Sequence, residues 1–421
     1  MEEKFLTKKK KAVKASTYFL FLCWLVYACS YLGKVNYSAN ITQIESYFSV
    51  THDSAGLVSS FFFFSYGAGQ IINGIFCKKY NIKWMVFGSL LVSGVANFVV
   101  SVTDNFAVIK YLWLTNGLAM SVLWPTLIRL LSETMSKKNM ARASVVMGTT
   151  VATGTMIIYG LSALFAEIAN FRYAFFLPAI VLPLVGLIWL CVYGKLMRKA
   201  KAEADAEDVE DDALVRSSSQ EKGKLGNQII AWIILLAFVA VVTNLLKDSL
   251  ITWVPAILKE TYAFPDSLSI LITLALPMIA IFANWMAVSL HKKLPDFMTG
   301  SGVYFAIGAV MILAIIGSIA VGWVLVTVLS FVVVTFVASC SNSNITSIFP
   351  LSMKGKGNSG LIAGLLNGFC YLGSTISSYG IGAVADAYGW TAVFWLLFAV
   401  ASFVVLLTVG YLVVKKCIRK K

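Results

Sequence analysis

The chain has 421 residues, of which 59% are hydrophobic and only 13% are charged, and its formal net charge is +14. This composition excludes an ordinary water-soluble domain, in which about a quarter of the residues are charged. Such a positive charge would suggest nucleic-acid binding in a soluble protein. Here, however, the basic residues stand in short clusters between apolar segments, so we expect a protein of the lipid bilayer with no nucleic-acid partner.

Apolar segments of roughly 20 residues, the length that crosses a ~30 Å hydrocarbon layer, recur along nearly the whole chain. They are apolar on all sides rather than alternating, which favours helices over the strands of a barrel. The sequence therefore predicts an all-α membrane protein with twelve transmembrane helices in two six-helix bundles. The approximate ranges are 16–37, 55–76, 85–103, 107–131, 144–165, 173–194, 228–257, 267–290, 300–318, 322–347, 360–383 and 391–414.

Basic residues are concentrated at alternate ends of the predicted helices. Lys137, Lys138 and Arg142 join the fourth and fifth helices, whereas the connectors 38–54 and 384–390 contain no lysine or arginine. Because positively charged loops remain on the cytoplasmic side, we expect a multi-pass protein of the cell membrane with both termini in the cytoplasm.

The segment 195–227 changes character from basic to acidic and then to serine-rich, which predicts a solvated and disordered cytoplasmic linker. It divides the chain into an N-terminal bundle, 1–194, and a C-terminal bundle, 228–421, each with six predicted helices. Two such halves are typical of transport proteins in which two repeats rock around a site at the bilayer midplane.

Two lysines occupy matching places in the two halves: Lys34 near the end of the first predicted helix and Lys247 inside the seventh. Ionisable groups within a bilayer are costly unless they face a partner or a wet cavity, so both are candidate substrate-binding residues. Two ammonium groups from opposite halves would form a clamp for a small anion such as a phosphate or carboxylate. The alternative is that each long side chain reaches the membrane surface.

Asp248 directly follows Lys247 and leaves two interpretations open. It could neutralise Lys247 in a local ion pair, or it could serve as the intramembrane carboxylate of a proton-coupled carrier.

Other polar and aromatic side chains on the predicted helices fit a small polar substrate, although each is as readily a hydrogen-bond partner between helices. Arg129, near the cytoplasmic end of the fourth helix, is a candidate gating or topological charge. No nucleophile, metal cluster or phosphate-binding loop is present, so we expect neither an enzyme nor a cofactor or metal site. The additional candidates for substrate binding are Tyr31, Tyr66, Gln70, Trp124, Asn342 and Tyr371.

Several of these residues stand in short motifs that occur in the same order in a known family. The motifs are Tyr31-Leu-Gly-Lys-Val-Asn-Tyr37, Tyr66-Gly-Ala-Gly-Gln70, Asn116-Gly117 with Trp124-Pro125 and Arg129, Leu245-Leu-Lys247 with Trp253-Val-Pro255, and Ala363-Gly364 with Tyr371-Leu-Gly373. In these the chain resembles the organophosphate:phosphate antiporters of the major facilitator superfamily, which include glycerol-3-phosphate and hexose-phosphate transporters. The resemblance covers nearly all of the chain outside the linker.

The resemblance implies that Lys34 and Lys247 hold a phosphate group between the two halves. Both positions are commonly arginine in that family, and lysine lacks the bidentate fork of arginine. Gln70 stands where a basic residue is usual. We therefore expect a monomeric secondary transporter that exchanges a phosphorylated metabolite for phosphate, its partners being this small anion and the bilayer. The alternatives are a proton-coupled carrier of carboxylates or other small molecules and a transporter-like sensor of sugar phosphates.

Overall fold

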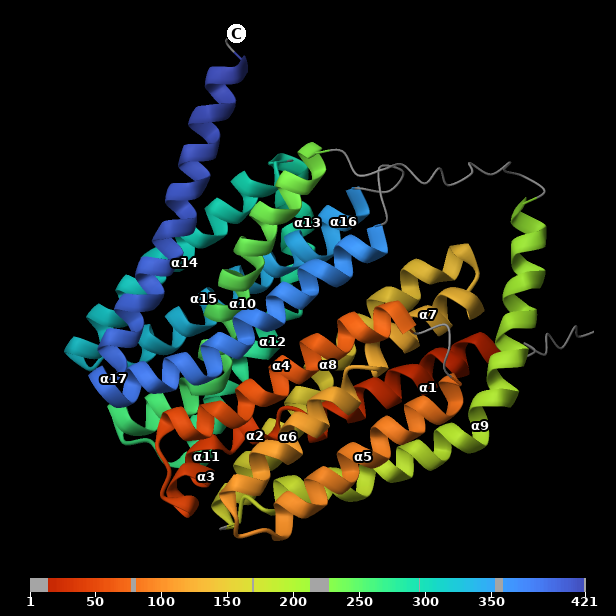
Figure 1. Ribbon diagram of the computed structural model, residues 1–421, viewed down its shortest axis with the longest axis horizontal. Coiled ribbons are helices and arrows are strands. Elements are labelled where there is room, and N and C mark those ends of the chain that lie inside the picture. Colours follow the sequence, from red (N-terminus) through yellow and green to blue (C-terminus); the bar gives the residue numbers. More distant parts are fainter. Residues whose placement is uncertain are drawn as a thin grey trace, which may run out of the picture.

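The computed structural model shows a protein built from helices that lie side by side in two bundles (Figure 1). The structure describes residues 14–76, 81–168, 170–212, 227–294, 296–352 and 359–419. The helices of the N-terminal bundle are α1 (Ala15–Ser30), η1 (Tyr31–Gly33), α2 (Asn36–Ala39), α3 (Ile41–Phe48), α4 (His52–Phe76), α5 (Ile82–Val102), α6 (Phe106–Met120), α7 (Leu123–Thr134), α8 (Lys137–Glu167) and α9 (Tyr173–Asp212).

The C-terminal bundle lies against the first along α4, which packs on α17, and along α8, which packs on α11 (Figure 1). Gly56 of α4 allows the closest approach, since a Cβ atom there would lie 2.1 Å from the carbonyl oxygen of Ser378. The helices of this bundle are α10 (Asn227–Tyr262), α11 (Asp266–Thr273), α12 (Ala275–Ala280), α13 (Ala283–Lys293), α14 (Phe297–Val321), α15 (Val324–Ser343), the π-helical turn η2 (Asn344–Ile348), α16 (Phe349–Ser352) and α17 (Ser359–Arg419).

The predicted membrane spans coincide in position with helices of the structure. Some predicted spans, however, consist of more than one helix, and two of them are merged into one helix. Among the described residues, ten helical stretches are long and apolar enough to cross a membrane, and a pair bent by 41° between residues 266 and 293 would make an eleventh. The last stretch, Ile362–Cys417, contains both of the final predicted spans. These two spans meet at Gly389, whose backbone (φ 76°, ψ 172°) is not helical.

Two expectations from the sequence are wrong in detail. The first predicted helix, 16–37, is broken: α1 ends at Ser30, and the chain continues through the 3₁₀ turn η1 to the short helix α2. The predicted disordered linker is helical at its start, because α9 continues through residues 195–212. Basic residues are followed four positions later by acidic ones, Lys199 by Glu203 and Lys201 by Asp205, a spacing compatible with a solvated helix. Residues 213–226 lie outside the described part of the chain.

Asparagine side chains satisfy the backbone at the break in the first span. The carbonyl oxygen of Gly33 accepts hydrogen bonds from Asn116 (2.8 Å) and Asn97 (3.2 Å), and Asn36 donates to Asn97 (2.7 Å) and to the carbonyl of Ala174 (3.1 Å). In a bilayer, irregular backbone persists only where the protein supplies such partners. The asparagines of α5 and α6 therefore stabilise the unwound segment that carries Lys34.

Gly33→Ala is expected to destabilise the protein by about 1–3 kcal/mol, the usual effect of overpacking. A Cβ atom at this position would lie 2.7 Å from Leu182 Cδ1 and 2.8 Å from Asn97 Nδ2, so it would displace the amide that binds the unwound segment. Thermal unfolding of the purified protein in detergent measures the effect. Gly160→Ala in α8 is the matched control, because a Cβ there has no neighbour within 4 Å. Equal melting temperatures for the two variants would contradict the prediction.

Candidate functional site

A cavity of about 250 Å³ lies between the two bundles and is lined from both. Its walls come from η1 and α2, α4 and α8 of the N-terminal bundle and from α10, α12, α15 and α17 of the C-terminal bundle. Six of the residues singled out in the sequence line it: Tyr31, Lys34, Lys247, Asp248, Asn342 and Tyr371.

Lys34 lies inside the protein, with only 7% of its surface exposed. Its Nζ atom is 3.8 Å from the centroid of the Tyr66 ring and 4.7 Å from that of Tyr31, and Phe62 is the next ring at 6.0 Å. Aromatic faces stabilise an ammonium group without neutralising it. Among the described residues, no carboxylate lies within ion-pair distance of Lys34. The side chain therefore turns into the cavity instead of reaching the membrane surface.

Lys247 enters the same cavity from α10 and is paired within its own bundle. Its Nζ atom lies 3.5 Å from Oδ1 of Asp248, which also accepts a hydrogen bond from the hydroxyl of Ser374. Asn244 donates to that hydroxyl (3.1 Å) and accepts from Asn342 (2.7 Å). The local ion pair considered from the sequence is thus present. Two ammonium groups and one carboxylate leave this cavity with a net positive charge.

The remaining predicted residues lie behind the lining or outside the cavity. Tyr66 packs its ring 4.7 Å from that of Tyr371, and its hydroxyl is 3.5 Å from that of Tyr27. Trp124 packs against Tyr27 at 4.8 Å. Gln70 accepts a hydrogen bond from Asn367 of the other bundle (2.5 Å), so it joins the halves. Arg129 lies in α7 and forms an ion pair with Glu133 at 2.8 Å.

Among the polar residues that sequence reasoning missed are Asn244, which lines the cavity, and Ser374, which binds Asp248. Asn244 precedes Asp248 by four residues, the spacing that places two side chains on one face of a helix. This spacing was a usable signal, since Asn244 and Asp248 follow an entirely apolar stretch, 229–242. Ser374 gives no comparable signal, because α17 contains several serines and only the packing of α10 against α17 selects this one.

The two bundles also meet in a cluster of charges at one end, which we call the latch: Glu45, His52, Glu260 and Asp386. The ring nitrogens of His52 lie 2.9 Å from Glu45 of its own bundle and 3.1 Å from Glu260 of the other. Asp386 accepts hydrogen bonds from the backbone amides of His52 (3.1 Å) and Asp53 (2.7 Å), which begin α4. Burial raises the pKa of the Glu45 carboxyl, and His52 offsets part of this rise.

Asp386→Asn is expected to favour separation of the bundles at the latch by roughly fivefold, since a carboxylate accepts these hydrogen bonds about 1 kcal/mol better than an amide does. The readout is the labelling rate of a cysteine at Ser38, which lines the cavity, by a membrane-impermeant thiol reagent applied from the latch side. The background chain would lack its native cysteines.

Asp104→Asn is the control for this experiment, because the Asp104 carboxylate pairs with Arg172 and accepts a hydrogen bond from Tyr47 (2.8 Å), both within its own bundle. Faster labelling in both variants would indicate a general effect of charge at this end, and unchanged labelling in Asp386→Asn would show that the latch does not hold the bundles together.

Comparison with known proteins identifies the family. Residues 23–378 match the model of the Major Facilitator Superfamily. The chain belongs to this superfamily. It is therefore a membrane transporter of the superfamily and not an enzyme, and its helical architecture is the major facilitator fold.

Its distant homologues in this superfamily include proteins with different named roles. A probable hexose phosphate transport protein of Chlamydia trachomatis is 22% identical over 84% of this chain and 81% of its own length. The probable sulfoacetate transporter SauU of Cupriavidus necator is 24% identical over 85% and 84%. The membrane sensor protein UhpC of Escherichia coli K12 is 20% identical over 93% and 91%.

The fold is also that of a solved transporter structure. A bacterial homologue of the human lysosomal transporter Spinster, in an inward-facing and unoccupied conformation, superposes with a TM-score of 0.68 over 95% of both chains at 13% sequence identity. At this level of identity the likeness concerns the fold alone.

Proposed function

We propose that this transporter carries a small organic anion by alternating access and that the anion is a phosphorylated metabolite exchanged for inorganic phosphate. The observation that carries this proposal is the convergence of Lys34 and Lys247, one from each bundle, on a single cavity. A similar role is named for the distant homologue of Chlamydia trachomatis. The sulfoacetate transporter among the relatives is likewise named for an anion.

The two lysines divide the binding of the anion between the halves. Lysine binds phosphate as a point charge, so each ammonium attracts the anion without fixing its orientation. A bound anion between them offsets their mutual repulsion and favours closure of the bundles around it. In the empty cavity the repulsion between the two lysines opposes closure of the bundles. The carrier can then reorient across the membrane only with an anion bound, as strict exchange requires.

The surrounding residues have distinct roles in this proposal. Tyr31, Tyr66 and Tyr371 form the aromatic wall near Lys34. Asn342 extends the hydrogen-bond network of Asn244 and Ser374 beside Lys247. Gln70 and Trp124 support this lining from behind. Asp248 offsets part of the positive charge of Lys247 through their ion pair, and Arg129, paired with Glu133, serves as a gating charge away from the latch.

We place this mechanism in a monomer with twelve spans, divided into bundles 1–194 and 228–421 by the connector 195–227. The basic clusters between helices support a cytoplasmic location for both termini and for this connector in the cell membrane. The latch then lies on the outer side of the membrane.

Counterflow in proteoliposomes tests the proposed exchange. Vesicles loaded with inorganic phosphate are given labelled phosphate, and unlabelled hexose phosphates, glycerol phosphate, sulfoacetate and simple carboxylates are compared as competitors from outside. We expect phosphate esters to compete and accumulation to require internal phosphate. Equal uptake into vesicles without internal anion would contradict strict exchange, and competition by carboxylates alone would contradict the phosphorylated substrate.

A proton-coupled carrier is the second candidate, favoured by the buried carboxylate of Asp248 at the cavity. Such a carrier would acidify or alkalinise the vesicle lumen when substrate is added, and Asp248→Asn would abolish this change. A sensor is the third candidate because UhpC is a distant homologue. A sensor would bind a sugar phosphate but would not transport it, so labelled substrate would not enter the vesicles.

A further inference from the structure

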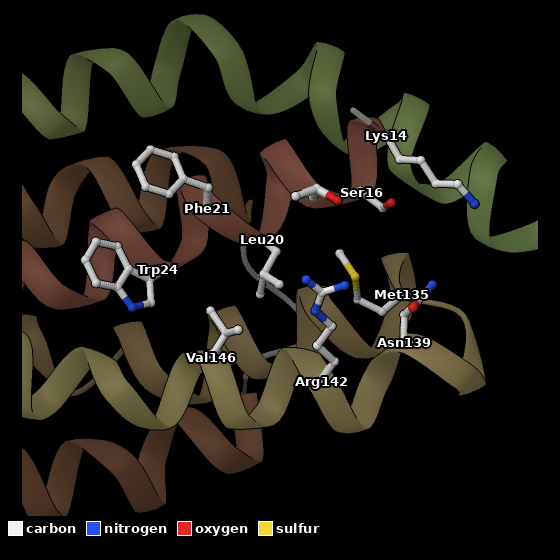
Figure 2. Close-up of a pocket in the computed structure, with 10 residues that line it drawn as sticks. Lys14, Ser16, Leu20, Phe21, Trp24, Met135, Asn139, Arg142 and Val146 are labelled. Carbon is white, nitrogen blue, oxygen red and sulfur yellow. The ribbon is translucent and has the colours of Figure 1, made fainter. Parts of the chain in front are cut away.

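A second cavity, of about 480 Å³, lies between α1 and α8 beside α9, near the end of the bundle where α1 begins (Figure 2). Leu20 and Trp24 of α1 face Val146 and Arg142 of α8 across it. This second cavity is separate from the substrate cavity.

The lining of α8 shows the direction in which this second cavity opens. Gly148 and Ala152 line the substrate cavity, whereas Arg142 and Val146 line the second cavity. At about 100° per residue, these two pairs lie about 120° apart around the helix axis, and Val151 and Thr155, which also line the substrate cavity, lie still farther round from the second cavity. The second cavity therefore opens away from the substrate path, toward the outside of the N-terminal bundle. Phe21 on its rim is 57% exposed within the span 15–33, as expected of a side chain in contact with lipid.

The second cavity has a polar end and an apolar end. Lys14, Ser16 and Arg142 lie at the end where α1 begins, and Leu20 and Trp24 continue the lining into the span. The indole of Trp24 is fixed by a hydrogen bond to Thr149 (3.0 Å). The lining therefore changes from basic and polar groups at one end of the cavity to apolar groups at the other. This order matches the order of groups in a phospholipid, from its phosphate to its acyl chains.

The charges around the second cavity favour an anionic headgroup. Within the described residues, Arg142 takes part in no ion pair, so its guanidinium is available to a ligand. The nearby carboxylate of Glu203 on α9 is already bound to the backbone amides of Ala15 (2.8 Å) and Ser16 (2.9 Å), which begin α1. Arg142 can therefore form a bidentate contact with a phosphate, which is the preferred partner of its planar donors.

We propose that this second cavity is a binding site for one anionic phospholipid of the leaflet on the side of the chain termini. Arg142 binds the phosphate of the headgroup, and one acyl chain lies along Leu20, Phe21 and Trp24. The apolar half of this lining distinguishes the lipid from free phosphate, which has no group to place there.

Native mass spectrometry of the delipidated, full-length protein in detergent tests this site. The probes are phosphatidylglycerol and phosphatidylcholine with identical acyl chains. We expect one phosphatidylglycerol to bind at least tenfold more tightly than phosphatidylcholine, and Arg142→Gln to remove this preference. Val146→Trp, which fills the apolar end without changing charge, is expected to reduce the binding of phosphatidylglycerol by a similar factor.

Lys293→Gln in α13 is the matched control, since it removes one positive charge from the other bundle. It should leave the preferred binding unchanged, and all variants should keep the melting temperature of the parent protein. Equal losses in Arg142→Gln and Lys293→Gln would overturn the proposal in favour of nonspecific attraction. Displacement of the lipid by millimolar glycerol phosphate would overturn it as well, because it would show a site for a free phosphate group.

Discussion

Lys34→Gln is expected to reduce anion exchange by about 100-fold, because truncating one partner of a desolvated charge pair costs ~2–5 kcal/mol. Lys34 is 7% exposed, and its ammonium lies over tyrosine rings that leave its charge available to the substrate. The glutamine keeps a hydrogen-bond donor, on a side chain shorter by one atom, but removes the charge. Initial rates of phosphate counterflow in proteoliposomes measure the effect.

Two comparisons make the Lys34 result specific. Lys34→Arg keeps the positive charge and should retain exchange, whereas Lys110→Gln in α6 removes a charge that does not line the substrate cavity. The variants must be inserted in equal amounts and unfold at similar temperatures. Exchange in Lys34→Gln at the level of Lys110→Gln would show that this lysine does not bind the anion.

Lys247→Gln is expected to cause a loss of similar size, about 100-fold, and to leave Asp248 as an uncompensated charge in the cavity. That carboxylate, bound to Ser374 and 8% exposed, would then repel an anionic substrate. The double variant Lys247→Gln/Asp248→Asn removes the repulsion. It should recover part of the exchange and of the thermal stability, while remaining well below the parent protein.

The double variant separates two roles of Lys247. If Lys247 served only to neutralise Asp248, removing both charges together would restore the parent rate. Recovery to that rate would therefore contradict direct binding of the anion by Lys247. Parent-level exchange in Lys247→Gln alone would contradict both roles.

The sequence was sufficient for an all-helical membrane architecture and for singling out the two lysines that line the cavity. A bilayer requires long apolar helices, so span positions follow directly from composition, and charged residues within such spans are conspicuous. Lys34 and Lys247 could be singled out for this reason, and the ion pair of Lys247 with Asp248 followed from their adjacency. The substrate-binding role of these residues, the domain boundaries, the monomer and the orientation of the termini stay predictions.

Details that depend on packing could not be predicted. The break before Lys34 contains no proline, and it forms because Asn97 and Asn116, far along the chain, bind the carbonyl of Gly33. The latch joins His52 to Glu260, residues more than 200 positions apart that only the association of the two bundles brings together. Local sequence carries no record of such distant partners, so Gln70 was proposed as a lining residue although it bonds to Asn367.

The most direct test of the lysine clamp is calorimetric binding of inorganic phosphate to the purified protein, to Lys34→Gln, to Lys247→Gln and to the variant with both changes. If both ammonium groups hold one anion, each single change should abolish most of the affinity, and the double change should weaken binding by much less than the two losses combined. Independent losses that add fully, or affinity equal to that of the parent protein in either single variant, would contradict the clamp.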